Sequence, residues 1–284
     1  MKKIVCLALS LLLILGVPCL AEGKTRVLAS IFPVYDIARQ VAGENAEVSM
    51  LVRCGAEEHG YEPTPADIIA IEECDVFLYI GGESDEWIED ILSSIDLTGK
   101  TVVRLMDCTD TMLEAGGEED EYDEHIWTSP VKAMDMARAI AQALGTDADA
   151  YVAELEALDG AIRETVSTAK RKEILFGDRF PLLYFAEEYG LTWRAAFPGC
   201  SEETEPDAAT MADLIDAMRE DKLPVVFHIE MGNERVANAI AQETGAQVLQ
   251  YHSCHNVTKE EFDGGITYIE LMYRNLKALK IALN

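Results

Sequence analysis

The sequence predicts an α/β protein of two lobes, each a parallel β-sheet covered by helices, joined by one long helix. Short β-rich apolar runs alternate with amphipathic segments along most of the chain, which is the pattern of parallel sheets. Between the two alternating halves, apolar residues recur at helical spacing from 147 to 171. A helix of this length is either a core helix of one large domain or a strut between lobes, and we predict the strut.

The first half of the mature chain, residues 22–145, is expected to form the N-terminal lobe. Thr64 can cap a helix there, and Pro65 suits the first helical position. The strands expected in this lobe are 25–30, 46–51, 76–80 and 101–105, and the other helices are 33–42, 87–95 and 129–144.

The second half repeats the alternation after a linking helix assigned to residues 146–172. The C-terminal lobe is expected to cover residues 173–284. Its expected strands are 173–176, 192–197, 224–228 and 246–251, and its helices are 180–189, 208–219, 233–244 and 259–283.

Residues 1–21 have the features of a signal peptide. Lys2 and Lys3 precede an apolar run, 4–17, that is too short to span a bilayer as a mature helix. Cleavage after Ala21 is the favoured outcome. Lipidation of Cys19 is the alternative, although Pro18 makes a poor context for it. We therefore predict an exported protein, in the periplasm or at the outer face of the cytoplasmic membrane, with a lipid anchor as its only membrane contact.

The charge and the cysteines exclude several classes of protein. The chain has 52 acidic and 23 basic residues, with a formal net charge of −29. A surface this acidic does not suit nucleic acid. Five cysteines follow the signal peptide without CxxC spacing, which argues against a structural zinc knuckle. Whether Cys200 pairs with Cys254 is left open.

An acidic stretch at residues 114–124 interrupts the first lobe. Its composition predicts a mobile, solvated loop. The alternative is a loop that gathers cations weakly and passes them inward.

The five histidines fall just after expected strands or in loops that precede helices. They are His59, His125, His228, His252 and His255. A single loop histidine is more often structural than functional. Five of them from both lobes favour a metal site, because ligands bind beyond the carboxyl ends of parallel strands and imidazole is a common zinc ligand. The sequence lacks GxSxG, Walker A, HExxH and GxGxxG motifs, so we predict that the protein is not an enzyme.

Several motifs resemble those of the zinc/manganese solute-binding proteins of ABC transporters, and they occur in the same order along the chain. Residues 27–36 (VLASIFPVYD) resemble the opening strand and helix of that family. Residues 58–67 (EHGYEPTPAD) match its first metal-ligand motif closely, and residues 123–130 (DEHIWTSP) resemble the second. The resemblance continues through the linking helix to the terminal helix and spans essentially the whole mature chain.

The resemblance implies a set of metal ligands. His59 and His125 would bind from the N-terminal lobe. The family's last ligand, usually an aspartate, closes the last strand, and here His252 takes that place. The remaining ligand follows the strand after the linking helix, where counting from the strand favours Asp178.

The fourth ligand is the weakest part of this assignment. If the position of this ligand is instead counted back from Tyr189 in the motif YGL, it falls on Arg179, which cannot bind a cation. His228, Cys254, His255 or a water are the alternatives to Asp178.

The resemblance also implies the fold and the function. Two Rossmann-like lobes would hold the metal in the cleft between them and deliver it to the membrane permease of an ABC importer. Three imidazoles favour zinc, as the transported ligand, over manganese. We expect a monomer. The alternatives are a protein of the same fold for manganese or iron, or a surface adhesin or envelope protein stabilised by metal.

Overall fold

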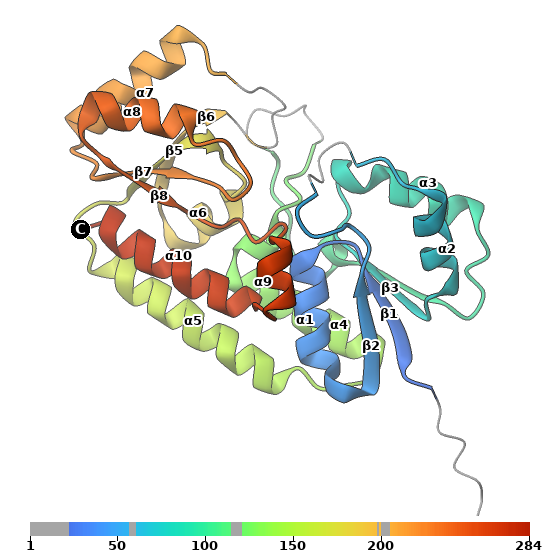
Figure 1. Ribbon diagram of the computed structural model, residues 1–284. Helices are drawn as coiled ribbons and strands as arrows, with labels where there is room; N and C mark the ends of the chain where they lie inside the picture. Colours follow the sequence, from blue (N-terminus) through green and yellow to red (C-terminus); the bar gives the residue numbers. More distant parts are fainter. Residues whose placement is uncertain (1–22, 57–60, 115–120, 198, 200–204) are drawn as a thin grey trace, which may run out of the picture.

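The computed structural model describes residues 23–56, 61–114, 121–197, 199 and 205–284 (Figure 1). The predicted signal peptide, Cys19, His59 and Cys200 lie outside the described residues.

Each lobe is built on a four-stranded, all-parallel sheet. The N-terminal sheet has the order β2-β1-β3-β4, and the C-terminal sheet has the equivalent order β6-β5-β7-β8. The predicted fold class is therefore confirmed. The strands are β1 (Thr25–Ala29), β2 (Ala46–Met50), β3 (Val76–Tyr79), β4 (Thr101–Arg104), β5 (Glu173–Arg179), β6 (Thr192–Phe197), β7 (Val225–His228) and β8 (Gln247–Gln250).

The helices pack on both faces of the sheets, so the central strands β3 and β7 are buried along their whole length. At the start of α2, the Asp67 carboxylate accepts hydrogen bonds from the amide and hydroxyl of Thr64, both at 2.7 Å. The helices are α1 (Phe32–Ala42), α2 (Pro65–Glu73), α3 (Glu86–Ser94), α4 (Pro130–Leu144), α5 (Asp149–Ser167), α6 (Leu183–Tyr189), α7 (Ala208–Glu220), α8 (Arg235–Thr244), α9 (Lys259–Asp263) and α10 (Tyr268–Ala282).

Three elements differ from the sequence prediction. The long helix α5 covers only Asp149–Ser167 of the 147–171 expected. Strand β5 continues beyond 176 to Arg179, with an irregular register after Phe176, and α6 consequently begins only at Leu183. The terminal helix is not continuous. It breaks at Gly265, whose φ of 74° is left-handed, and α10 then starts at the capping residue Thr267.

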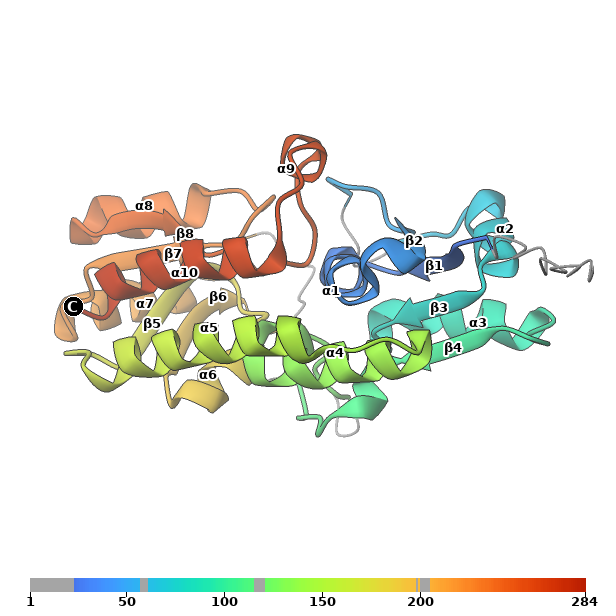
Figure 2. The ribbon, with the colours of Figure 1, turned by 90° about the horizontal axis from the view of Figure 1, so that it is seen from below.

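One hydrophobic core runs through both lobes. Its buried side chains come from β1 and α1, from the adjacent helices α4, α5 and α10, and from β5 and β7. The helix α5 lies beside α10 along the C-terminal lobe and packs against α4 (Figures 1 and 2). Because the core is shared, the two sheets are not separate hydrophobic units. The predicted lobe boundaries at 145 and 173 stay predictions.

Polar contacts also join the lobes. Asp36 in α1 is fully buried and accepts hydrogen bonds from the amide of Tyr268 and from Nε of Arg39, both at 2.6 Å. Arg39 in turn donates to the carbonyl of Ile266 at 2.6 Å. The Tyr268 hydroxyl donates to the carbonyl of Trp127 at 2.7 Å. The first turn of α10 is thus bonded to two segments of the N-terminal lobe.

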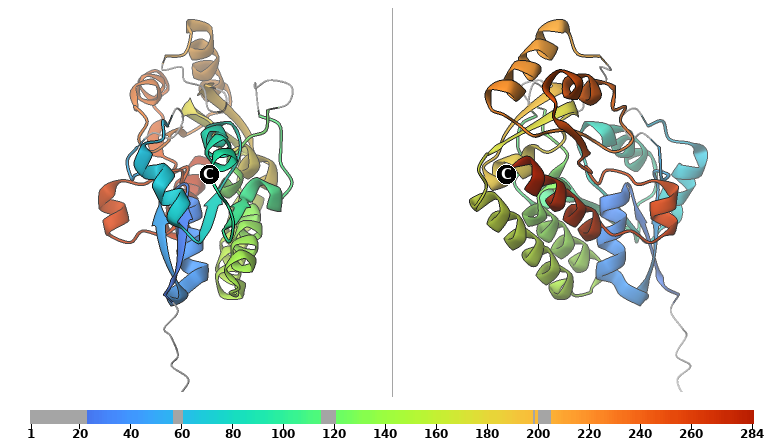
Figure 3. Two further views of the ribbon diagram at one scale, coloured as in Figure 1. Left: turned by 90° about the vertical axis from the view of Figure 1, so that its right-hand side faces the viewer. Right: turned by 60° about the vertical axis from the view of Figure 1, so that its left-hand side comes forward.

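The short helix α9 of the C-terminal lobe adds an aromatic contact with the N-terminal lobe. It lies next to α1 (Figures 1 and 3), where the ring centroids of Tyr35 and Phe262 are 5.2 Å apart.

We expect Tyr268→Phe to lower the free energy of unfolding by about 1–2 kcal/mol, because it leaves the buried carbonyl of Trp127 without its donor. Urea unfolding measures this change. Tyr273→Phe is the matched control, since the Tyr273 side chain is exposed. Equal stability of the two variants would contradict the role given to the Tyr268 hydroxyl.

Candidate metal centre

Two histidines from opposite lobes meet at the junction. The rings of His125 and His255 contact each other edge to face, with their centroids 5.5 Å apart. His125 directly precedes the short 3-10 helix Ile126–Thr128 of the N-terminal lobe, and His255 lies in the loop that follows β8. This contact is the main geometric feature of the candidate centre.

The orientation of His125 is set by Asp123. One carboxylate oxygen of Asp123 accepts a hydrogen bond from the His125 amide at 2.8 Å and lies 3.1 Å from Nδ1 of the ring. A carboxylate only accepts hydrogen bonds, so the ring proton belongs on Nδ1 and the lone pair on Nε2. Both residues are buried. This carboxylate-histidine pairing is the usual support of a metal-binding imidazole.

Trp127 fixes the distance between the lobes at this point. Its indole Nε1 donates to the carbonyl of Ser253 at 2.9 Å. Its ring centroid lies 5.1 Å from that of His125 and 5.1 Å from that of His255. The indole therefore packs against both imidazoles while it is bonded across the junction.

The loop that carries His255 is bonded in two directions. Glu230 accepts from the Ser253 amide at 2.6 Å and also from the Ser253 hydroxyl. Asn256 donates through Nδ2 to the carbonyls of Arg53 and Ala56, at 2.9 and 3.0 Å. The second pair of bonds brings the segment that ends at Ala56 next to the His255 loop.

The cleft beside these rings contains carboxylates from the N-terminal lobe. Asp85 and Glu124 line it together with Trp127 and His255. Both carboxylates are buried. Asp85 accepts from the Gly81 amide at 2.9 Å, and Glu124 accepts from a backbone amide at 3.1 Å. Fixed negative charge next to imidazole favours a cation.

His252, expected from the sequence as a ligand, faces elsewhere. Its Nδ1 accepts a hydrogen bond from the Cys254 amide at 3.0 Å and lies 3.4 Å from a carboxylate oxygen of Glu230. The closer amide contact satisfies hydrogen-bond geometry, so we assign Nδ1 as the acceptor and place the proton on Nε2. The described ring contacts of His125 go to Trp127 and His255, not to His252.

Asp178 lies at the end of β5 and is committed to backbone contacts. One carboxylate oxygen accepts from the Arg179 amide at 2.9 Å, and the other accepts from the Ile229 amide at 3.2 Å. Gly232 packs directly against the Asp178 carboxylate, because a Cβ at Gly232 would lie only 2.5 Å from Oδ2 of Asp178. Burial raises the pKa of Asp178, and the two amides oppose this shift. Asp178 thus ties β5 to the loop after β7.

His228 is also engaged locally. Its Nδ1 lies 2.9 Å from the carbonyl of Ile229, and its Nε2 lies 3.7 Å from Glu234.

A family model described as the periplasmic component A of the zinc-uptake complex matches residues 27–282. The chain belongs to this family. The predicted family is therefore confirmed, and its periplasmic description agrees with the predicted export. The family is one of transport components rather than enzymes. None of the described helices is both long enough and apolar enough to cross a membrane.

Named relatives and solved structures agree with the family. The zinc-binding lipoprotein AdcA of Streptococcus pneumoniae is 32% identical over 309 residues, which cover 99% of this chain and 61% of AdcA. The chain thus spans less than two thirds of the length of that relative. The high-affinity zinc uptake system protein ZnuA of Bacillus subtilis is 31% identical over 288 residues, covering 92% of this chain and 88% of ZnuA.

Three solved structures share the fold. The metal-dependent lipoprotein YcdH of Bacillus subtilis has a TM-score of 0.81 at 30% identity, covering 92% of this chain and 100% of its own. The Zn(II)-bound ZnuA-like domain of AdcA has a TM-score of 0.77 at 30% identity, and the match covers 92% of this chain and 99% of that domain. The laminin binding protein of Streptococcus agalactiae is described as an adhesin with metal transporting activity. It has a TM-score of 0.79 at 26% identity, and the match covers 92% of this chain and 100% of that protein's chain.

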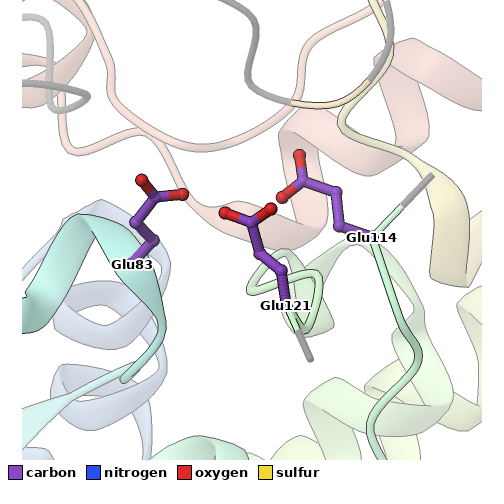
Figure 4. Close-up of side chains that lie close together, drawn as sticks. All are labelled: Glu83, Glu114 and Glu121. Carbon is purple, nitrogen blue, oxygen red and sulfur yellow. The ribbon is translucent and has the colours of Figure 1, made fainter. Parts of the chain in front are cut away.

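In this family member, a cluster of three glutamates also lies near the junction. Carboxylate oxygens of Glu83, Glu114 and Glu121 lie within 4.8 Å of one another (Figure 4). Glu114 and Glu121 both belong to the acidic stretch 114–124, and the Glu114 amide donates to the carbonyl of Glu121 at 2.8 Å. The sequence predicted a solvated loop here. Residues 115–120 lie outside the described residues, so that expectation stays a prediction, and the residues on either side of them pair with each other.

Sequence reasoning named His255 only as an alternative and missed Glu83. The run His-Ser-Cys-His has two imidazoles three residues apart, and no periodicity in a loop tells which of them faces the cleft. Glu83 is distant in sequence from the acidic stretch, so only the fold brings it there.

The glutamate cluster should make stability depend on pH. A hydrogen bond with Glu121, followed by burial and the neighbouring carboxylates, raises the pKa of Glu83 from 4.5 to about 7. A raised folded-state pKa stabilises the fold fully below the unfolded value and loses this contribution as pH rises through the folded value. The stabilisation is therefore present in acid and is lost between about pH 4.5 and 7.

We expect Glu121→Gln to lose less thermal stability than the unchanged protein when the pH is raised from roughly 5 to 8. Thermal unfolding at both pH values measures the difference. Glu156→Gln removes an exposed carboxylate on α5 and is the control. If the stability of both variants changes with pH as in the unchanged protein, the raised pKa of Glu83 has no effect on stability.

Proposed function

We propose that this chain captures a zinc ion between its lobes and delivers it to the permease of an ABC importer. The observation that carries the proposal is the contact of the His125 ring with the His255 ring, with Asp123 on Nδ1 of His125 leaving the lone pair on Nε2. The proposal is supported by the relatives, which are described as a zinc-binding lipoprotein and as a zinc uptake protein.

We assign His59, His125 and His255 as the protein ligands. His59 follows Ala56 by three residues in the sequence, and the carbonyl of Ala56 accepts from Asn256. His255 replaces the expected His252 because its ring is the one that contacts His125. Three imidazoles suit zinc better than manganese, which prefers more carboxylate oxygen.

A water is the proposed fourth ligand, which gives the tetrahedral arrangement that zinc favours. Asp178 is less suitable because both of its oxygens accept backbone amides. Cys254 is a free, fully buried thiol. Burial raises its pKa well above the usual value, so the thiolate that binds metal is disfavoured.

The proposed partner is the membrane permease, approached by a single chain. Attachment of that chain through a lipid on Cys19 is the alternative to release after Ala21. A surface adhesin is the competing function, and one related structure is described as both adhesin and metal transporter. Deletion of the gene for this protein separates the two functions. Poor growth of the deleted strain under zinc chelation supports transport, whereas normal growth with lost adhesion supports the alternative.

We expect His125→Ala and His255→Ala each to weaken zinc binding by about 100-fold or more, since each removes a ligand rather than a residue behind one. Calorimetry of the metal-stripped mature protein measures the affinity, with about one zinc per chain expected. His252→Ala is the matched control and should bind within about threefold of the unchanged protein. No zinc uptake by the unchanged protein would refute the proposed function, and a larger loss for His252→Ala would return that residue to the ligand set.

We expect Asp123→Asn to weaken zinc binding about 10- to 100-fold, because an amide no longer fixes the proton on Nδ1 of His125. Asp178→Asn should leave zinc affinity nearly unchanged and lower thermal stability, because it weakens the bonds to two backbone amides. Calorimetry and thermal unfolding of both variants provide the comparison. If Asp178→Asn loses zinc affinity while Asp123→Asn keeps it, the two roles are reversed.

A further inference from the structure

A second polar pocket lies in the C-terminal lobe, on the side of the 252–255 loop that carries His252. Its volume is about 280 Å³, near the lower end of the range for small-ligand pockets. The loops after β7 and β8 and the start of α9 form its wall. The titratable groups in that wall are Glu230, His252, Glu260 and Glu261.

His252 presents a hydrogen-bond donor to this pocket. Only 5% of the residue is exposed, and its Nδ1 accepts from the Cys254 amide. The ring proton is therefore on Nε2, and no hydrogen-bond partner of Nε2 is found among the residues that the structure describes. Because His252 lines the pocket, this N–H can donate to an acceptor atom of a ligand bound there.

The carboxylates give the same pocket a negative potential. Glu230 is buried and holds Ser253, so its position is fixed. Glu261 accepts from the Thr258 amide at 3.2 Å and from Arg274 at 3.0 Å. Glu260 is exposed at the rim on the first turn of α9. Three carboxylates near one arginine favour a cationic group in the ligand.

The backbone around the pocket is strained. Met231, which lines it, has a φ of 58°, and Cys254, which binds Nδ1 of His252, has a φ of 64°. Non-glycine residues in this region cost conformational energy and occur preferentially at ligand sites.

We propose that this pocket binds a small organic cation that combines an ammonium or guanidinium group with a neutral oxygen acceptor. The cationic group would lie among Glu230, Glu260 and Glu261, and the oxygen would accept from Nε2 of His252. A bare metal ion fits less well, because the His252 nitrogen that faces the pocket carries the proton. The site is separate from the zinc centre, which uses His255 on the other side of the same loop.

The test uses L-argininamide as the probe, which has two cationic groups and an amide oxygen. The mature protein is titrated in the presence of a metal chelator, and binding is followed by NMR chemical shifts. We expect saturable binding that Glu260→Gln weakens about threefold, as for an exposed charge. His252→Phe should weaken it about fivefold, the size of one hydrogen bond.

Two controls test the proposed chemistry. Glu156→Gln changes the net charge equally at a distant exposed position and should leave binding unchanged, and N-acetylglycinamide, which lacks a cation, should not bind. The proposal is overturned if L-argininamide does not bind, if Glu156→Gln weakens binding as much as Glu260→Gln, or if the neutral probe binds equally well. Displacement of the probe by zinc alone, without chelator, would instead identify a metal site and would also overturn it.

Discussion

The hydrogen bond from the Trp127 indole to the carbonyl of Ser253 is the contact on which the candidate centre depends. It crosses the junction between the lobes at the point where His125 and His255 meet. The carbonyl of Trp127 is itself bonded to the Tyr268 hydroxyl at the start of α10. A large, rigid ring held at both its side chain and its backbone leaves the neighbouring imidazoles little freedom. The two lobes therefore meet at a defined distance.

Nearby hydrogen bonds then decide what each histidine can do. Asp123 places the proton of His125 on Nδ1, which leaves Nε2 with a lone pair for a metal. The Cys254 amide does the opposite to His252, because it occupies the Nδ1 lone pair and makes Nε2 a donor. Two histidines in one small region are therefore suited to different ligands. One fits a metal ion, and the other fits an oxygen acceptor in the separate pocket.

The same contacts bear on how the lobes could move in the proposed function. A single apolar core runs through both lobes, and Asp36 and Asn256 add buried polar bonds across the junction. Wide separation of the lobes would expose this core and leave those polar groups unpaired, which costs free energy. Small tilts and shifts of the 252–255 loop keep the core intact. Such local changes are compatible with the proposed capture and release of a metal.

The sequence by itself determined the alternating β/α order, all eight strands and the family motifs. These features are local, since they follow from apolar periodicity and from short motifs. The sequence led to His252 as the ligand and gave His255 only as an alternative to Asp178. No periodicity applies in the irregular loop that contains both histidines. Only the tertiary structure shows that the ring of His255 contacts His125, in a loop held by the indole of Trp127 and by the bonds of Asn256 to the N-terminal lobe. The role of Asp178 likewise depends on Ile229, a residue distant in sequence that the parallel sheet brings to the end of β5. Such contacts join segments far apart in the chain, within one lobe for Asp178 and between the lobes for Trp127 and Asn256, so they exist only in the folded protein.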